Sequence, residues 1–200
     1  PPRGPPTSRR LLSGLSRRHL PMVASRLMTV HLAISMGDPA GIGPEIVLRA
    51  LAAALPPAEL TVFGNLVVFD RTAGALGLER PVSGVRWVDV GGEAGQSVRP
   101  GATGAAAGAL QVQSLEAAVG ALQRGEAHGL CTAPITKAAA RAAGFPFPGH
   151  TEYLAHALGA ARYAMMLAGP TLRVVPVTGH LPLREVAAAL SEELVAARLV

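Results

Sequence analysis

From Met28 onward, short β-branched runs alternate with longer Ala- and Leu-rich stretches of helical period. This alternation is typical of layered α/β folds, in which helices cover a sheet. The predicted strands are Val30–Ser35, Leu60–Phe63, Val85–Val90, Gly129–Thr132, Ala164–Leu167 and Leu172–Val177. The predicted helices are Pro44–Leu55, Leu66–Leu76, Thr103–Gln123, Thr136–Ala143, Glu152–Leu158 and Arg184–Leu199. Gly169-Pro170 is a turn signal, which leaves the last two strands open to an antiparallel hairpin rather than another crossover.

Residues 1–27 lack this pattern. They contain six arginines and no acid, are rich in Pro and Ser, and show no hydrophobic periodicity. We therefore expect a disordered leader at 1–27, followed by a folded region at 28–200. Two interpretations of the leader stay open: sequence upstream of a true start at Met28, which we favour, and an organelle transit peptide.

Composition and charge exclude several classes of protein. Of 200 residues, 50% are hydrophobic and 16% charged, which is enough to bury the core of one domain or two small ones. Every uncharged stretch of membrane-spanning length is interrupted by Gly or Pro, so no membrane partner is expected. The leader holds six of the 18 basic residues, and the other 12 balance the 13 acids, so we expect no nucleic-acid partner. The single cysteine, Cys131, excludes an internal disulfide scaffold.

Two segments join a predicted strand to a predicted helix and carry a candidate catalytic residue. In SMGDPAGIGPE, glycines allow a tight turn after the first strand, and Asp38 would suit a substrate hydroxyl, an amine or a metal. The glycine spacing is not that of a dinucleotide-binding fingerprint, and an ordinary strand-to-helix turn without a ligand stays open. In CTAPITK, Lys137 is the only lysine beside seventeen arginines, which favours a role for a compact ammonium. A solvated surface lysine is the alternative.

Two further segments carry histidines at turns. In FPFPGHTEYL, Thr151 is predicted to cap a helix, which would place His150 beside unpaired N–H groups that attract anions. In VTGHLPL, His180 follows a predicted strand and is placed to bind a metal or to act as an acid or base. Open α/β sheets gather ligands at the carboxyl ends of their strands, so we expect Asp38, Lys137 and His150 to line one cleft.

Taken in order, ISMGDPAGIGPEI, TAPITK, FPFPGHTEYLA and VTGHLPL resemble the 4-hydroxythreonine-4-phosphate dehydrogenase family of vitamin B6 biosynthesis. The resemblance covers residues 28–200. It implies a two-domain α/β architecture like that of the isocitrate and isopropylmalate dehydrogenases, incomplete here at the C-terminus. It also implies a cytoplasmic homodimer with the active site at the dimer interface.

The implied reaction is NAD-dependent oxidation and decarboxylation of 4-phosphooxy-L-threonine to 3-amino-2-oxopropyl phosphate, with a divalent metal (Zn, Mg or Co). By the resemblance, His150 and Thr151 match the substrate-contacting pair, and His180 matches the first of three metal-ligating histidines. We assign catalytic roles to Lys137 and Asp38 and leave the residues that bind NAD unassigned.

The sequence departs from the family pattern in three ways. Thr136 stands where many relatives have Asn, and Gly179 where many have Thr. More seriously, the sequence stops before the second and third metal histidines, so we expect a fragment that does not turn over by itself and in which His180 binds metal weakly. The alternatives are a sister dehydrogenase acting on 4-phosphoerythronate or 4-phosphothreonate, and a catalytically inactive remnant that serves as a binding or assembly module.

Deletion of residues 1–27 should leave the melting temperature unchanged, because a segment without hydrophobic periodicity has no apolar face to bury. Thermal unfolding of the full chain and of residues 28–200, followed by circular dichroism, checks this expectation. A large loss of stability in the shortened chain would show that the leader packs on the folded region.

Overall fold

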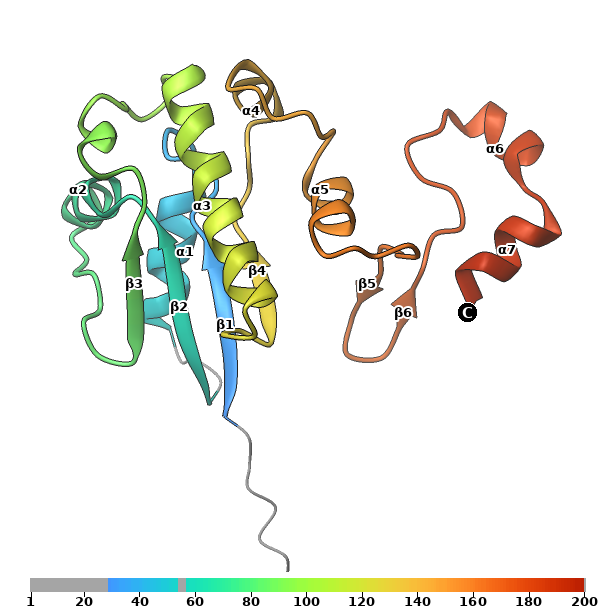
Figure 1. The fold of residues 1–200 in the computed structure, drawn as a ribbon, viewed down its shortest axis with the longest axis horizontal. Helices are drawn as coiled ribbons and strands as arrows, with labels where there is room; N and C mark the ends of the chain where they lie inside the picture. Colours follow the sequence, from blue (N-terminus) through green and yellow to red (C-terminus); the bar gives the residue numbers. More distant parts are fainter. Residues whose placement is uncertain (1–28, 54–56, 200) are drawn as a thin grey trace, which may run out of the picture.

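A computed structural model describes residues 29–53 and 57–199, so the predicted leader at 1–27 lies outside the described residues. The four strands β1 (Val30–Ser35), β2 (Ala58–Gly64), β3 (Val85–Asp89) and β4 (Gly129–Thr132) form a parallel sheet in the order β3-β2-β1-β4 (Figure 1). The predicted α/β class and these four strands are confirmed, with bounds shifted by at most two residues.

Helices pack on both faces of this sheet, as parallel strands require. On one side lie α1 (Gly43–Ala52) and α2 (Leu66–Leu76), and on the other lies α3 (Ala105–Gln123) (Figure 1). Side chains alternate along β1 accordingly: Leu32 and Ile34 pack with the cluster that α1 and α2 contribute to, whereas Ala33 packs with Ala118 and Ala121 of α3. Both faces of the sheet are therefore core faces.

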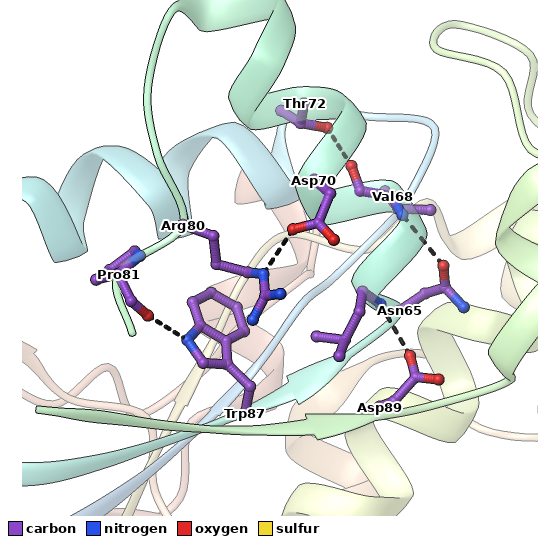
Figure 2. Close-up of polar contacts among 9 residues, drawn as sticks. Asn65, Val68, Asp70, Thr72, Arg80, Pro81, Trp87 and Asp89 are labelled. Atoms are coloured by element: carbon purple, nitrogen blue, oxygen red, sulfur yellow. Dashed lines mark hydrogen bonds and ion pairs between the residues drawn. The ribbon is translucent and has the colours of Figure 1, made fainter. Parts of the chain in front are cut away.

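The junction of β2 with α2 is held by Asn65, which is fully buried (Figure 2). Its Oδ1 accepts a hydrogen bond from the N–H of Val68 at 3.1 Å and caps α2. Its Nδ2 donates to the carbonyls of Val90 and Gly92 at 2.9 and 2.6 Å. One amide thus ties the start of α2 to the segment after β3.

A second set of polar contacts fixes the approach to β3 (Figure 2). Arg80 pairs with Asp70 at 2.6 Å, and its guanidinium lies 5.1 Å from the ring centre of Trp87. Trp87 Nε1 donates to the carbonyl of Pro81 at 2.7 Å, while the ring packs edge-on against the buried Phe69. The indole therefore covers the core with its polar atom satisfied.

The remaining elements are short. They are the 3₁₀ helix η1 (Gly92–Gln96), α4 (Lys137–Ala142), α5 (His150–Ala157), β5 (Leu167–Ala168), β6 (Arg173–Val174), α6 (Leu183–Ala189) and α7 (Glu192–Leu199). The last two predicted strands do form an antiparallel hairpin, β5 with β6, but each is only two residues long. Residues 161–174 are exposed throughout, so neither strand has a core to extend against.

The single helix predicted at Arg184–Leu199 is wrong, because the structure divides it into α6 and α7. Leu190 is extended, with ψ of 129°, and Ser191 Oγ accepts a hydrogen bond from the N–H of Leu194 at 3.1 Å. Ser191 thus begins a new helix instead of continuing the old one, since serine oxygens favour N-cap positions over helix interiors. No helix within the described ranges is long and apolar enough to cross a membrane.

Replacement of Asn65 by Ala should lower the free energy of unfolding by about 2 to 4 kcal/mol. The change removes the cap of α2 and leaves the carbonyls of Val90 and Gly92 without their hydrogen-bond donor. Urea denaturation measures the change. Asn65→Asp retains the capping oxygen but sets a carboxylate against two carbonyl oxygens, and we expect it to rescue little. A loss below about 0.5 kcal/mol for Asn65→Ala would contradict this account of the junction.

Candidate functional site

The loops that follow β1 and β4 are joined at the carboxyl edge of the sheet. Gly37 has a positive φ of 73°, and a side chain there would collide with the carbonyl of Pro134. The N–H of Asp38 donates to that same carbonyl at 2.9 Å. Glycine at position 37 therefore allows the two loops to touch backbone to backbone.

Asp38 is only 2% exposed. Its Oδ1 accepts a hydrogen bond from the N–H of Ala40 at 2.9 Å, which stabilises the turn. Its Oδ2 is buried without a hydrogen-bond partner among the residues that the structure describes. A buried carboxylate oxygen left unpaired is costly, and it is a feature that functional sites retain. In this conformation, however, the carboxylate is closed to solvent, so contact with a substrate requires the loop to open.

Two buried polar side chains on α3 position these loops, and the sequence analysis missed both. Ser114 Oγ accepts from the N–H of Met36 at 2.8 Å and donates to the carbonyl of Phe63 at 2.6 Å. Gln111 Nε2 donates to the carbonyl of Thr136 at 3.1 Å, and its Oε1 accepts from the N–H of Thr136 at 2.9 Å. The signal in the sequence was a polar pair three residues apart on a helix otherwise rich in Ala, Leu and Val.

Thr136 directly precedes α4, and Lys137 is the first residue of that helix. The two hydrogen bonds from Gln111 to the backbone of Thr136 therefore fix the position at which α4 starts. Gly108 of α3 strengthens this placement, because a side chain there would collide with the carbonyl of Ala139 in α4. The two helices are thus in close contact. Lys137 itself is exposed at its end of α4.

Lys137 lies against the start of α5. A methyl carbon built onto Gly149 would lie 3.5 Å from Cε and 3.7 Å from Nζ of Lys137. Gly149 is the N-cap of α5, and His150 and Thr151 are its first two residues, so the prediction that Thr151 caps the helix is wrong. The extended backbone of Gly149 ends the preceding loop two residues earlier than expected.

His150 is half-buried next to this ammonium. Burial lowers the pKa of its imidazole below the ordinary value, and the positive charge of Lys137 lowers the pKa further. Its Nε2 is buried and has no hydrogen-bond partner within the described part of the chain. Lys137, the N–H groups that open α5 and a neutral His150 together form a cluster suited to an anionic ligand.

Aromatic packing holds α5 in place. Phe145, Phe147 and Tyr153 form a triangle with ring centres 5.2 to 5.4 Å apart, and they pack with Leu115 and Val119 of α3. Burial raises the pKa of the Tyr153 phenol, and the carboxylate of Glu116 adds to the effect. The Pro-flanked FPFP segment therefore anchors the end of α5 that carries His150.

His180 lies in a second part of the site. It is exposed and has a φ of 59°, the only positive φ of a non-glycine residue in the described ranges. With Thr151, Glu152 and Arg198 it lines a cavity of about 190 Å³. Arg198 Nη1 donates to the carbonyl of Tyr163 at 2.9 Å, which ties α7 to the start of the hairpin segment. A left-handed conformation at a residue other than glycine marks a position held by its surroundings.

The structure brings predicted residues together in two pairs, and the single cleft expected for Asp38, Lys137 and His150 stays a prediction. Lys137 meets His150, and Thr151 shares a cavity with His180, while Asp38 lies in the adjoining loop. The expectation treated all three residues of the cleft as following strands. That holds for Asp38 and Lys137, but His150 follows α4.

A divalent metal does not fit the donor set found. Within residues 29–53 and 57–199, no group of three or more His, Cys, Asp or Glu side chains could hold a metal ion. His180 supplies one candidate ligand, whereas a catalytic site requires about three from protein.

A parallel sheet with polar loops gathered at its carboxyl edge defines an α/β protein of the kind that binds small ligands at that edge. The family described as "Pyridoxal phosphate biosynthetic protein PdxA" matches residues 41–200, and the chain belongs to this family.

Relatives agree with this assignment. The 4-hydroxythreonine-4-phosphate dehydrogenase of Burkholderia vietnamiensis is 39% identical over 175 residues, covering 81% of this chain and 52% of that protein. A Bradyrhizobium diazoefficiens protein, provisionally named D-threonate 4-phosphate dehydrogenase, is 35% identical and covers 82% and 51%. The crystal structure of the Klebsiella pneumoniae 4-hydroxythreonine-4-phosphate dehydrogenase is similar with a TM-score of 0.76 and 30% identity, covering 88% of this chain and 57% of that one. The chain spans about half the length of the curated relatives it matches.

His150 should titrate below the ordinary histidine pKa of about 6.5. Because the unfolded chain binds the proton more readily, the contribution of His150 to stability is complete above about pH 6.5 and is lost as the pH falls through the folded pKa. Imidazole NMR titration gives the pKa directly. In Lys137→Met the pKa should rise only partway towards 6.5, since burial is the larger cause.

Arg141→Met is the matched control, because Arg141 is an exposed cation on the same helix, one turn further along. It should leave the His150 titration unchanged. An equal shift in both variants would mean that net charge, and not the contact with Lys137, sets the pKa.

Proposed function

We propose that the chain is the ligand-binding half of a dehydrogenase that oxidises and decarboxylates 4-phosphooxy-L-threonine, with NAD as hydride acceptor, to give 3-amino-2-oxopropyl phosphate. The single observation that carries the proposal is the cluster of Lys137, the start of α5 and the half-buried His150. Membership of the family supplies the reaction class. The cluster supplies a reason for an anionic substrate to bind at these residues.

The overall chemistry places definite demands on the side chains. The secondary alcohol loses its carbon-bound hydrogen to NAD as hydride and its hydroxyl proton to a base, leaving a ketone β to the carboxylate. Loss of CO2 then leaves an electron pair on carbon, with negative charge on the ketone oxygen, and protonation of that carbon completes the reaction. An ammonium near the oxygen stabilises this charge and carries a proton to donate.

In this proposal Lys137 is the catalytic cation and proton donor. His150 and Thr151 bind the substrate: a neutral imidazole offers one donor and one acceptor, and Thr151 faces the same cavity as His180. Asp38 is the second catalytic group, and it reaches the substrate only after its loop opens, because the carboxylate is buried here. Support from the geometry is more direct for Lys137 than for Asp38.

The divalent metal, the NAD site, a cytoplasmic homodimer and the two-domain dehydrogenase architecture also belong to the proposal, on the family resemblance. His180 would contribute one metal ligand, and the others must come from outside the described residues, which lack a suitable set. No step above relies on them.

A sister substrate is the second candidate, and the relative named for D-threonate 4-phosphate favours it. That ligand shares the phosphate, the carboxylate and the hydroxyl on carbon 3, but has a hydroxyl in place of the amine on carbon 2. Glu152 lines the cavity with Thr151 and His180, and a carboxylate there suits a substrate ammonium better than a hydroxyl. This observation favours the amino substrate over the sister compound.

Calorimetric titration of the 200-residue chain with 4-phosphooxy-L-threonine and with D-threonate 4-phosphate tests the proposal. Lys137→Met should raise Kd for either ligand by about tenfold or more, or about 1.4 kcal/mol, because it removes the positive charge beside the start of α5. Arg141→Met should leave both affinities unchanged.

Two results would count against the proposal. Binding that is indifferent to Lys137→Met would remove the anion-binding role of this cluster. Tighter binding of D-threonate 4-phosphate than of the amino compound would favour the sister activity.

A further inference from the structure

The amino ends of the parallel strands carry polar residues that the candidate site does not use. Strands β1, β2 and β3 begin at the lower end of the sheet in Figure 1, and α3 ends there. A cavity of about 320 Å³ lies at this edge, and its polar side chains are those of His31, Glu59, Thr61, Arg86 and Glu126. We call it the amino-edge cavity. Small-molecule pockets have volumes of about 300 to 1,000 Å³, so it has room for a small ligand.

The register of the sheet arranges these side chains in two cross-strand pairs. His31 of β1 is paired with Glu59 of β2, and Thr61 of β2 is paired with Arg86 of β3. Side chains two residues apart on a strand share a face and lie about 7 Å from one another. The cavity therefore has a carboxylate in one pair and a guanidinium in the next, on the same face of the sheet.

The first pair has a fixed backbone. The N–H of His31 donates to Nδ1 of His128 at 3.0 Å, and the N–H of His128 donates to the carbonyl of His31 at 2.8 Å. Nε2 of His31 lies 3.3 Å from Oε2 of Glu59. Because a carboxylate accepts hydrogen bonds at both oxygens, Glu59 can also bind a further donor such as an ammonium.

Arg86, in the second pair, forms no ion pair within residues 29–53 and 57–199. Glu126 lines the same cavity but is engaged by Arg124, whose Nε and Nη2 donate to its two oxygens at 2.8 and 3.0 Å. The hydrogen bonds from Arg124 lower the pKa of the Glu126 carboxyl, and the charges of Arg124 and Arg86 add to the effect. The guanidinium of Arg86 beside the hydroxyl of Thr61 is therefore a donor set suited to a ligand carboxylate.

We propose that the amino-edge cavity binds a zwitterionic α-amino acid with a small aliphatic side chain. The ligand carboxylate would lie against Arg86 and Thr61, and its ammonium against Glu59. Ala121 and Ala127 line the same cavity and offer an apolar wall to the ligand side chain. The carboxyl end of α3 lies next to Ala121, and the helix dipole favours a positive charge there.

Ligands of a single charge fit the cavity less well. A purely anionic ligand is repelled by the carboxylates of Glu59 and Glu126, and a simple cation is repelled by Arg86. A ligand that carries both charges satisfies both cross-strand pairs. The cavity lies at the opposite edge of the sheet from the loops that carry Asp38 and Lys137, so this proposal does not depend on the proposed reaction.

L-Valine is the probe, and two analogues each remove one charge: isovalerate lacks the ammonium, and isobutylamine lacks the carboxylate. Titration of the isotope-labelled 200-residue chain, followed by the amide NMR signals, gives affinity and location together. L-Valine should shift the signals of Thr61 and Arg86 and leave those of Lys137 and His150 in place. Each analogue should bind about tenfold more weakly or worse, since each loses one charged contact.

Substitutions test the two pairs separately. Arg86→Gln and Glu59→Gln alter exposed side chains, so the chain should still fold, and each should raise the Kd for L-valine by about tenfold or more. Thr61→Val keeps the shape of the side chain and should raise the Kd by about fivefold, because it removes one hydrogen bond. Arg173→Gln and Glu79→Gln are the matched controls, since both residues are exposed and neither lines the cavity. Both should leave the Kd unchanged.

Four results would overturn the proposal. The signals of Thr61 and Arg86 could stay in place at high millimolar L-valine, or the shifts could be confined to Lys137 and His150, which would assign binding to the carboxyl edge. Either analogue could bind as tightly as L-valine, which would mean that a single charge suffices. Arg173→Gln could weaken binding as much as Arg86→Gln does, which would attribute the effect to net charge.

Discussion

The arrangement of the site depends on one buried polar contact set, the pair Gln111 and Ser114 on α3. Both side chains are fully buried, and each makes two hydrogen bonds to backbone groups near the carboxyl edge: Gln111 to Thr136, and Ser114 to Met36 and to Phe63 of β2. Buried polar groups of this kind are costly when a partner is lost, so they specify one arrangement of the loops rather than merely adding attraction. Helix α3 thereby sets the spacing between the loops that carry Asp38 and Lys137.

The same constraint accounts for the electrostatics of the Lys137 cluster. With the start of α4 fixed by Gln111 and that of α5 by the aromatic triangle, Lys137 and His150 are held together, although the ammonium repels a protonated imidazole. The lowered pKa of the imidazole favours its neutral form, so Lys137 supplies the positive charge here, with the carboxylate of Glu152 close by. A neutral ring beside this cation offers a ligand one N–H donor and one acceptor, whereas a protonated ring would offer two donors and no acceptor.

Much of this could be predicted from the sequence, and the failures have local causes. The four sheet strands were found because parallel strands are continuous apolar runs. The helix after Leu190 was misjudged because the apolar period continues through Ser191, whose hydroxyl favours capping over continuation. Thr151 was taken as the cap because it is the usual residue type, whereas Gly149 adopts the extended geometry required. The polar pair Gln111 and Ser114 stood out on an apolar helix, but nothing in the sequence identified the partner of Gln111, which is the backbone of Thr136, 25 residues away.

The candidate site has two parts, the cluster of Lys137 and His150 and the surroundings of His180. They differ in how firmly the rest of the structure holds them. Lys137 and His150 are positioned by buried contacts with α3, which belongs to the core. His180 belongs to a stretch whose side chains are mostly exposed and whose ties, such as the bond from Arg198 to Tyr163, lie at the surface. Exposed hydrogen bonds add little net stability, so the ties that hold His180 in its left-handed conformation are individually weaker than the buried contacts around Lys137. A metal with further ligands from elsewhere would supply what that segment lacks, whereas the Lys137 cluster is already organised by the residues present.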